Sequence, residues 1–462
     1  MARWIPDTER EEAEMLSALG LRSAEELFAD VPKKARIGRL GIGPALSEAE
    51  AVRQIDRILE RNRPYSKFVS CLGGRIAARY TPAALDGILQ RSEFYTSYTP
   101  YQPEASQGML QAMFEFQSLW VELTGMDVAN SSLYDGATAS GEAMLLCHRA
   151  HEGKRFLVPE SLPWEERSVL ENYATGPGIL VESIPYDPHT GGLDLDAVRA
   201  SVGRGDVFGM LADVPNGFGH LDEGILSLRS VLGTIPLVVH ADPLSLAVLE
   251  PPGAYGADIV VGEGQGFGIP PSYGGPLVGL FACRKELVRF APGRIVGATH
   301  DRDGRRAYTL TLQTREQHIR RSRATSNICT NQSLVALAFV LYASLLGPSG
   351  LAELQRSLAE KARAMAQALA AVEGIEAPRF DAPYLGEFTI ELASGTAVEF
   401  LDRMRRRGVL AGHPLSDPRP GRGNGAPARI LVAATETIDA KAIQKIATAA
   451  AASARPRAGG PA

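Results

Sequence analysis

The segment Tyr134–Ser140 carries residues that could bind an anion. Gly136 and Thr138 follow a short apolar run and open a predicted helix, and their neighbours are small. Backbone N–H groups at a helix N-terminus lack partners within the helix, and the helix dipole attracts negative charge there. The segment therefore predicts a phosphate cradle. The alternative is an ordinary strand–turn–helix junction, which often contains glycine and threonine.

Asp242 is a second candidate for ligand binding. It follows the apolar run Leu237–Ala241, which we predict to be a strand. In open α/β sheets, ligands bind beyond the carboxyl ends of the strands. A carboxylate at that place could pair with the protonated pyridine nitrogen of pyridoxal phosphate (PLP), a pairing that makes this cofactor an electron sink. The alternative role for Asp242 is to cap the turn that begins at Pro243.

The glycine-rich run 262–268 stands where a PLP enzyme of this architecture would carry its Schiff-base lysine. The sequence has Gln265 and Gly266 there, and no lysine occurs between Lys154 and Lys285. Without a lysine no internal aldimine forms, so we expect the chain to bind PLP non-covalently at most. The glycines predict a loop that approaches a cofactor, a substrate or a partner chain closely.

The segment 313–331 is basic and then becomes neutral and polar. It contains Arg315, followed by a patch that includes Thr325 and Asn327. Guanidinium groups bind phosphate or carboxylate bidentately. A solvated run of charges is the alternative, but the neutral patch and the apolar helix that follow favour a binding function.

These residues are predicted to lie on an α/β scaffold. Between about residues 106 and 340, short apolar runs alternate with helical or turn segments, which predicts a mostly parallel sheet covered on both faces. The predicted strands are Val128–Leu133, Arg155–Val158, Gly178–Ile184, Val207–Asp213, Leu237–Ala241 and Ile259–Val261. We expect the fold of the large domain of a PLP-dependent enzyme.

Four parts are predicted along the chain. An N-terminal helical clamp over 1–63 has helices at 7–31 and 47–61, the second opened by a capping box at Ser47. A large domain over 64–345 is followed by a smaller α/β domain over 346–450 and a disordered tail over 451–462. The elements predicted in the small domain are helices at 351–373 and 396–407 and strands at Phe388–Leu392 and Arg429–Ala433.

Composition excludes several classes of function. The net charge is −5 and the isoelectric point is about 6.0, so nucleic acid and anionic membranes are not expected partners. No window approaches ~18 uninterrupted apolar residues, and no apolar leader opens the chain, so we expect a cytoplasmic protein. The four cysteines form no metal-binding pattern and are expected to be reduced, buried thiols.

Longer motifs together resemble one family. They are Arg91–Glu104, Ser106–Gly108, Glu122–Asn130, Tyr134–Ala139, Val261–Gln265, Pro292–Gly297 and Ala324–Gln332. In this order they are similar to subunit 1 of the two-subunit glycine dehydrogenase (decarboxylating), the P-protein of the glycine cleavage system. The similarity runs from Ile5 to about Glu436 and so covers nearly the whole chain.

The resemblance implies an aminotransferase-like fold of type I and a heteromeric, aminomethyl-transferring glycine dehydrogenase. In that family PLP sits in subunit 2, glycine loses CO2, and the aminomethyl group passes to the lipoyl arm of the H-protein. A missing lysine is then expected of subunit 1. Because related dimers share residues across their interface, the candidates for a shared site or interface are Arg91, Tyr95, Tyr98, Tyr101, Gly136, Thr138, Asp242, Arg315, Thr325 and Asn327.

One segment departs from the family pattern. Ala77, Ala78 and Arg79 stand where the family usually has Tyr, Asp and His. Two alternatives to a catalytic subunit of glycine dehydrogenase remain open at this point. The chain could be a non-catalytic scaffold that stabilises subunit 2 or recruits the H-protein, or it could belong to a specialised pathway that uses a different amino acid.

Overall fold

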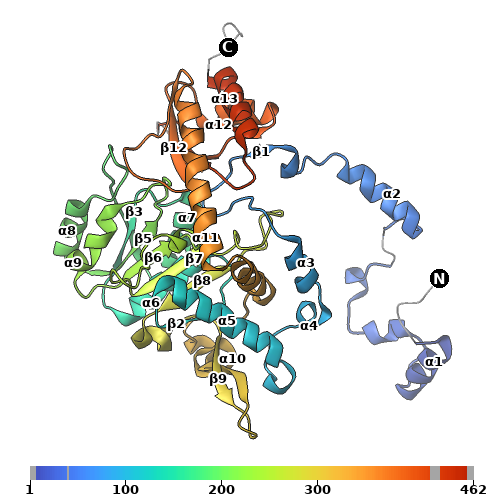
Figure 1. Cartoon of the computed structure of the whole chain (residues 1–462). Helices are drawn as coiled ribbons and strands as arrows, with labels where there is room; N and C mark the ends of the chain where they lie inside the picture. The colour runs from blue at the N-terminus through green and yellow to red at the C-terminus, as the bar shows by residue number, and fades with distance from the viewer. Residues whose placement is uncertain (1–6, 39–40, 417–426, 455–462) are drawn as a thin grey trace. The chain divides into compact units, whose positions relative to one another are not determined.

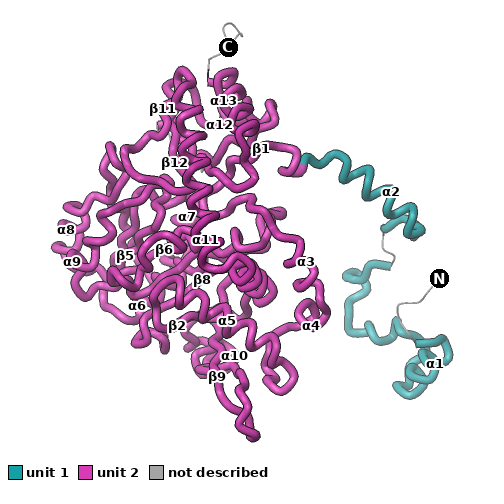
Figure 2. Tube along the Cα trace, viewed as in Figure 1, with its two compact units in different colours: residues 1–63 teal, residues 64–462 magenta. Residues whose placement is uncertain are grey.

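The computed structural model describes residues 7–38, 41–416 and 427–454. The chain divides into two compact units, 1–63 and 64–462 (Figure 2). In the first unit, α1 (Glu9–Ala18) and α2 (Glu48–Leu59) each begin at a capping box, formed by Thr8 with Glu11 and by Ser47 with Glu50. The helix predicted over 7–31 is wrong in its second half. Gly20 has a φ of 71°, which no helix allows, and short 3-10 turns follow.

A seven-stranded sheet forms the centre of the second unit (Figure 1). Its order is β2-β8-β7-β6-β5-β3-β4, and the pairs from β7 through β4 are all parallel. The strands are β2 (Val128–Ala129), β3 (Arg155–Pro159), β4 (Leu180–Ile184), β5 (Val207–Val214), β6 (Leu237–Ala241), β7 (Ile259–Glu263) and β8 (Gly279–Cys283). Every residue of β5, β6 and β7 is buried, as expected for parallel strands covered on both faces. The predicted mostly parallel α/β sheet is confirmed, while the antiparallel β8 was not predicted.

Helices cover this sheet and continue toward the C-terminus. They include α5 (Gln107–Thr124), α6 (Gly136–Ala150), α7 (Trp164–Thr175), α8 (Leu195–Gly203), α9 (Leu228–Leu232) and α11 (Ser333–Ala370). In α11, Gly347 has non-helical φ and ψ and precedes Pro348, so the helix is kinked there. By length and composition α11 could cross a membrane, but half of its most apolar window is buried in the protein. Phe339 of α11 packs edge-on against Phe116 of α5 at 5.5 Å, as a core helix does.

A second sheet lies at the far end of α11 (Figure 1). Its order is β11-β12-β15-β14, formed by Ile375–Glu376, Glu387–Leu392, Arg429–Ala433 and His413–Pro414. The helices α12 (Ala397–Arg406) and α13 (Ala440–Ala454) pack against one another, and a separate apolar cluster fills this region. Residues 451–454 belong to α13, so the predicted tail is wrong there, and its remainder, 455–462, lies outside the described residues.

The segment 64–103 contains short elements. They are β1 (Val69–Ser70), which pairs in parallel with β13 (Val409–Leu410), then α3 (Ala83–Leu89) and α4 (Ser92–Tyr95). A hairpin of β9 (Ile295–His300) and β10 (Arg306–Thr311) precedes α10 (Gln317–Arg320). All four cysteines are free, but Cys329 is exposed, which corrects the expectation that every thiol is buried.

Candidate functional site

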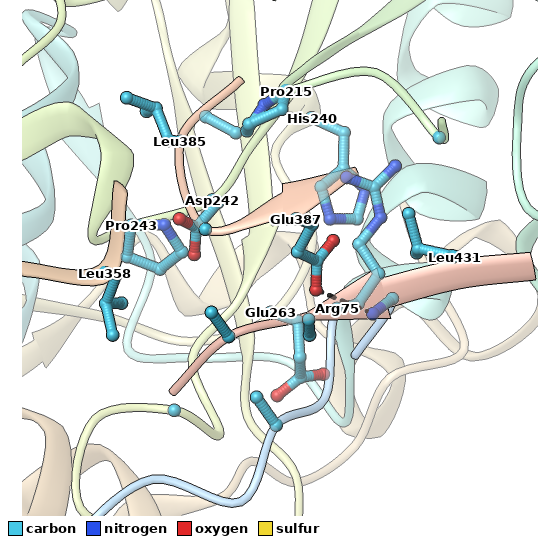
Figure 3. Close-up of a pocket in the computed structure, with 18 of the residues that line it drawn as sticks. Arg75, Pro215, His240, Asp242, Pro243, Glu263, Leu358, Leu385, Glu387 and Leu431 are labelled. Carbon is cyan, nitrogen blue, oxygen red and sulfur yellow. Dashed lines mark hydrogen bonds between the residues drawn. The ribbon is translucent and has the colours of Figure 1, made fainter. Parts of the chain in front are cut away.

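Residues 73–79 cross the edge of the large sheet at which its parallel strands end. They form hydrogen bonds with Glu387 of the second sheet and with Gln265, which follows β7. The backbone N–H of Gly74 donates to Glu387 Oε1 at 2.9 Å. Ala77 exchanges two hydrogen bonds with the Gln265 side chain, at 3.0 and 3.2 Å. Cavities of about 70 and 330 Å³ adjoin this segment and share Arg75, His240 and Glu263 among their lining residues (Figure 3). The place where ligands usually bind is therefore partly occupied by the chain itself.

Arg75 is the centre of a buried charged network. Its Nη2 lies 3.1 Å from both Glu166 Oε2 and Asp213 Oδ2. Glu166 Oε1 also contacts His240 Nδ1 at 2.7 Å and accepts from Ser140 Oγ at 2.6 Å. Arg75 has a φ of 82°, unfavourable for any residue other than glycine, so the strong ion pairs must hold that conformation.

The acids of this network carry different charges. Burial raises the pKa of Asp213 to about 7, against the opposing effect of Arg75. Burial also opposes ionisation of Glu166, yet His240 and Arg75 lower its pKa to about 2. Burial lowers the pKa of His240, and the Arg75 charge adds to that effect. Glu166 is therefore the carboxylate whose negative charge balances the charge of Arg75. Asp213 contacts the same guanidinium group but holds its proton more tightly.

The N-terminus of α6, the predicted phosphate cradle, is occupied by carboxylates of the chain. Asp135 Oδ1 accepts from Thr138 N at 2.7 Å, and Glu263 Oε2 accepts from Gly136 N at 2.9 Å. Glu263 Oε1 further accepts from Gln265 N at 2.9 Å. A phosphate would have to displace both acids to reach these two amides.

Asp242 takes the capping role considered for it. Its Oδ2 accepts from Ser245 N at 3.0 Å and so caps the turn at Ser245–Ala247. The residue also lines the smaller cavity at the end of β6 (Figure 3). Its capping role leaves it among the groups that a small ligand in that cavity would meet.

Gly266, near which a Schiff-base lysine was expected, lies against the side chain of Arg79. A Cβ added to Gly266 would lie 3.0 Å from Arg79 Nε and 3.3 Å from Arg79 Cδ. Arg79 Nη1 lies 3.8 Å from Glu436 Oε2. Any longer side chain at Gly266 would therefore have to move Arg79.

Known proteins share this architecture and sequence. The family model for the glycine cleavage system P-protein matches residues 2–446. The chain belongs to the P-protein family. A probable glycine dehydrogenase (decarboxylating) subunit 1 from Geobacillus kaustophilus is 44% identical over 438 residues, which cover 94% of this chain and 95% of the relative. One from Moorella thermoacetica is 44% identical over 418 residues, covering 89% and 91%.

Solved structures agree with this assignment. A crystal structure of glycine decarboxylase (P-protein) of the glycine cleavage system, in inhibitor-bound form, matches with a TM-score of 0.87 and 37% identity, covering 98% of this chain and all of that one. Glutamate decarboxylase from Lactobacillus brevis matches with a TM-score of 0.66 at 12% identity, covering 94% of this chain and 99% of that one, which shows the fold alone. The fold is that of the type I PLP-dependent enzymes, as expected.

The P-protein family uses PLP, but the residues of this chain do not fit that cofactor. Gly266 offers no amine, and Arg79 covers it. The amides of Gly136 and Thr138 already donate to the side chains of Glu263 and Asp135, so neither is free to bind a phosphate. Among the residues that the structure describes, no group of three or more metal-ligating side chains is present either. Neither the amine nor the free amides that would hold PLP are therefore present among the described residues at this edge of the sheet.

Arg315 does not act as predicted for an anion-binding group. It is buried, and its guanidinium donates to the backbone carbonyls of Ala291, Gly293 and Leu312. Its own carbonyl accepts from Thr325 N at 3.1 Å. The residue therefore fixes the loop before β9, and the predicted bidentate ligand contact is wrong because every side of its fork already has a protein acceptor.

The remaining candidates lie on the surface. Thr325 and the exposed Asn327 line a separate surface pocket together with Arg149 and Arg321. Tyr95 and Tyr98 expose 67% and 82% of their surface. The structure therefore separates the predicted residues into cavity positions and surface positions.

Two more of the predicted surface residues have partners within the chain. Tyr101 is half exposed, and its hydroxyl accepts from Arg294 at 3.3 Å. Arg91 pairs with Glu93 at 2.7 Å, and both side chains are exposed.

Sequence reasoning missed the charged network. Glu166, Asp213 and Arg75 were not singled out from the sequence. Arg75 lies 91 and 138 residues from its two partners, so no local pattern connects them. The sequence does contain the pair Gly73-Gly74, and paired glycines indicate a close approach of the backbone to another group. In the structure that group is Glu387, with which a Cβ at Gly73 would collide.

Proposed function

We propose that this chain is the lysine-less subunit of a heteromeric glycine dehydrogenase (decarboxylating). In this proposal a PLP-bearing subunit 2 performs the chemistry, in which glycine loses CO2 and the aminomethyl group passes to the lipoyl group of the H-protein in the cytoplasm. The observation that supports the proposal is that the position near which a lysine was expected is a glycine, Gly266, and that the Arg79 side chain lies against it. A chain whose lysine position is both empty of amine and covered depends on another chain for the cofactor.

The surface candidates are proposed to face that partner. Tyr95 and Tyr98 are exposed on a P-protein chain whose relatives are named as a first subunit. Exposed aromatic residues supply large contact areas and are enriched at the centres of interfaces. Thr325 and Asn327 are proposed to belong to the same interface. The division into a clamp over 1–63, a large domain over 64–345 and a small domain over 346–450 is part of this proposal.

The test is reconstitution. The purified chain should release no labelled CO2 from carboxyl-labelled glycine in the presence of PLP and lipoylated H-protein, and should show no aldimine absorbance. Addition of a lysine-bearing subunit 2 should restore CO2 release. Release of CO2 by the chain alone would contradict the proposal.

A scaffold without a share in the active site is the second candidate. The observation that favours it is that Arg75 and Arg79, at the edge of the sheet where ligands usually bind, pair with carboxylates of the same chain. The variants Tyr95→Phe and Tyr98→Phe keep the rings for packing and remove only the hydroxyls. If the complex assembles normally, a fall in turnover of about tenfold indicates a shared site. Unchanged turnover favours the scaffold.

A further inference from the structure

The N-terminal unit, residues 1–63, has no apolar core among its described residues (Figure 2). None of the residues in 7–38 and 41–63 is buried, and the helices α1 and α2 contain no buried side chain. The second unit, by contrast, has several clusters of buried apolar side chains. Folding costs conformational entropy, which a protein offsets mainly by burying apolar surface. The N-terminal unit therefore needs another surface to pack against.

The unit presents enough apolar surface for a stable interface. Twelve large apolar side chains among its described residues expose between 39% and 79% of their surface. Single exposed apolar residues are ordinary, but a group of them marks a contact surface. Twelve such side chains at about half exposure present on the order of 500 Å² of apolar area. A standard interface buries about 800 Å² per partner, of which about 60%, or again about 500 Å², is apolar.

Helix α2 gives this surface its clearest pattern. Val52, Ile55 and Leu59 follow one another at spacings of three and four residues, so they lie along one side of the helix. Each exposes about half of its surface, 50%, 53% and 49%. The helix also carries three acidic residues and two arginines. Helices that bind anionic membranes are rich in Lys and Arg on their polar face, so the composition of α2 favours a protein partner.

We propose that the apolar side of α2, with the other exposed apolar residues of the N-terminal unit, binds an apolar groove on subunit 2. Amphipathic helices bind such grooves through anchors spaced three and four residues apart, which is the spacing of Val52, Ile55 and Leu59. The partner is taken from the proposed function, on which this inference rests. The P-protein family model matches from residue 2 onward and so includes this unit, which supports a partner that the family also shares.

The first test uses the full chain alone. The double variant Val52→Ser with Ile55→Ser should unfold at the same urea concentration as the unchanged chain, and the two should sediment alike. Val398→Ser is the matched control, because Val398 is a single apolar residue of α12 that is 67% exposed. A loss of stability beyond that of the control would show that the chain's own second unit covers this face. Dissociation of a larger species would show that a second copy covers it, and either result would overturn the proposal.

The second test mixes each chain with the lysine-bearing subunit 2 and measures assembly by sedimentation over a range of concentrations. Val52→Ser should weaken assembly about fivefold and the double variant about thirtyfold, because each change removes an apolar side chain that becomes buried on binding. Val398→Ser should assemble as the unchanged chain does. Normal assembly of the double variant would overturn this proposal and leave the proposed function standing. Failure of the two unchanged chains to assemble would contradict both.

Discussion

Two regions of this P-protein chain carry its candidate residues, and they differ in how their polar groups are satisfied. At the cavity edge, Glu263 is buried and Arg75 is 16% exposed, and both are bonded to other parts of the same chain. On the surface, Tyr95 and Tyr98 are exposed and Arg91 pairs only with its neighbour Glu93. The difference teaches that polar groups at the edge of the sheet are paired within the chain, whereas the surface candidates leave aromatic rings and charges in contact with solvent.

The largest expected effect comes from removing the cation of the buried network. Arg75→Met leaves Glu166 and Asp213 without their shared partner and should lower the free energy of unfolding by about 3–5 kcal/mol. Urea denaturation measures this change. Arg91→Met, which removes an exposed ion pair, is the matched control and should change stability by about 1 kcal/mol or less. Equal losses of stability in the two variants would contradict the claim that the network around Arg75 stabilises the fold more than the exposed pair of Arg91 does.

The next effect concerns pH. Burial raises the folded-state pKa of Asp213 to about 7, above the unfolded value near 3.8, so the folded chain holds this proton more tightly. The contribution to stability is therefore present at low pH and is lost as the pH rises toward 7. Compared with Asp213→Asn, the unchanged chain should lose about 2 kcal/mol between pH 5 and pH 7.

Urea denaturation of both chains at each pH measures this difference. The control Asp196→Asn alters an exposed carboxylate and should follow the unchanged chain at every pH. A stability difference between Asp213→Asn and the unchanged chain that does not vary with pH would contradict the role assigned to burial.

A smaller effect on the free energy of unfolding is expected at Gly266, near which a Schiff-base lysine was expected. Gly266→Ala places a Cβ against Arg79 and should lower the free energy of unfolding by about 1–2 kcal/mol. The double variant Gly266→Ala with Arg79→Ala should show a positive coupling, because the second change removes the obstacle. Gly176→Ala is the control, since nothing lies within 4 Å of the added Cβ there. Additive losses in the double variant would show that Arg79 does not cover this position.

The smallest effect on the isolated chain is expected at the surface. Tyr98→Ala should change its free energy of unfolding by about 0.5 kcal/mol or less, because the side chain is 82% exposed. The same variant should weaken assembly with subunit 2, measured by sedimentation of the mixed chains. A large loss of stability with normal assembly would show that Tyr98 supports the fold of its own chain and does not contact the partner.

Local sequence predicted much of the scaffold. The run Leu237–Ala241 is β6 as expected, because a short, wholly apolar run is typical of a parallel strand covered on both faces. The helix predicted over 47–61 begins at its capping box, since cap and first turn are neighbours in sequence. The antiparallel β8 was missed because its Gly and Cys residues give no strong strand pattern, and pairing with β7 decides its conformation.

The candidate site was predicted less completely. Asp242 lines the cavity as expected, because the carboxyl end of a parallel strand fixes where the next residue lies. Arg315 was misjudged, since a basic segment gives no sign that one of its guanidinium groups turns inward to backbone carbonyls. The charges around Arg75 come from α7 and β5, which only the folded sheet brings together.

The sequence by itself determined that this chain has no lysine between Lys154 and Lys285, the interval in which a Schiff-base lysine was expected. It could not determine what occupies the space where that lysine would stand. Only the tertiary structure decided that Arg79 covers Gly266 and that Glu263 takes the amide of Gly136. The absence of a residue type is a property of composition, whereas the filling of a cavity depends on contacts between segments that are far apart in the chain.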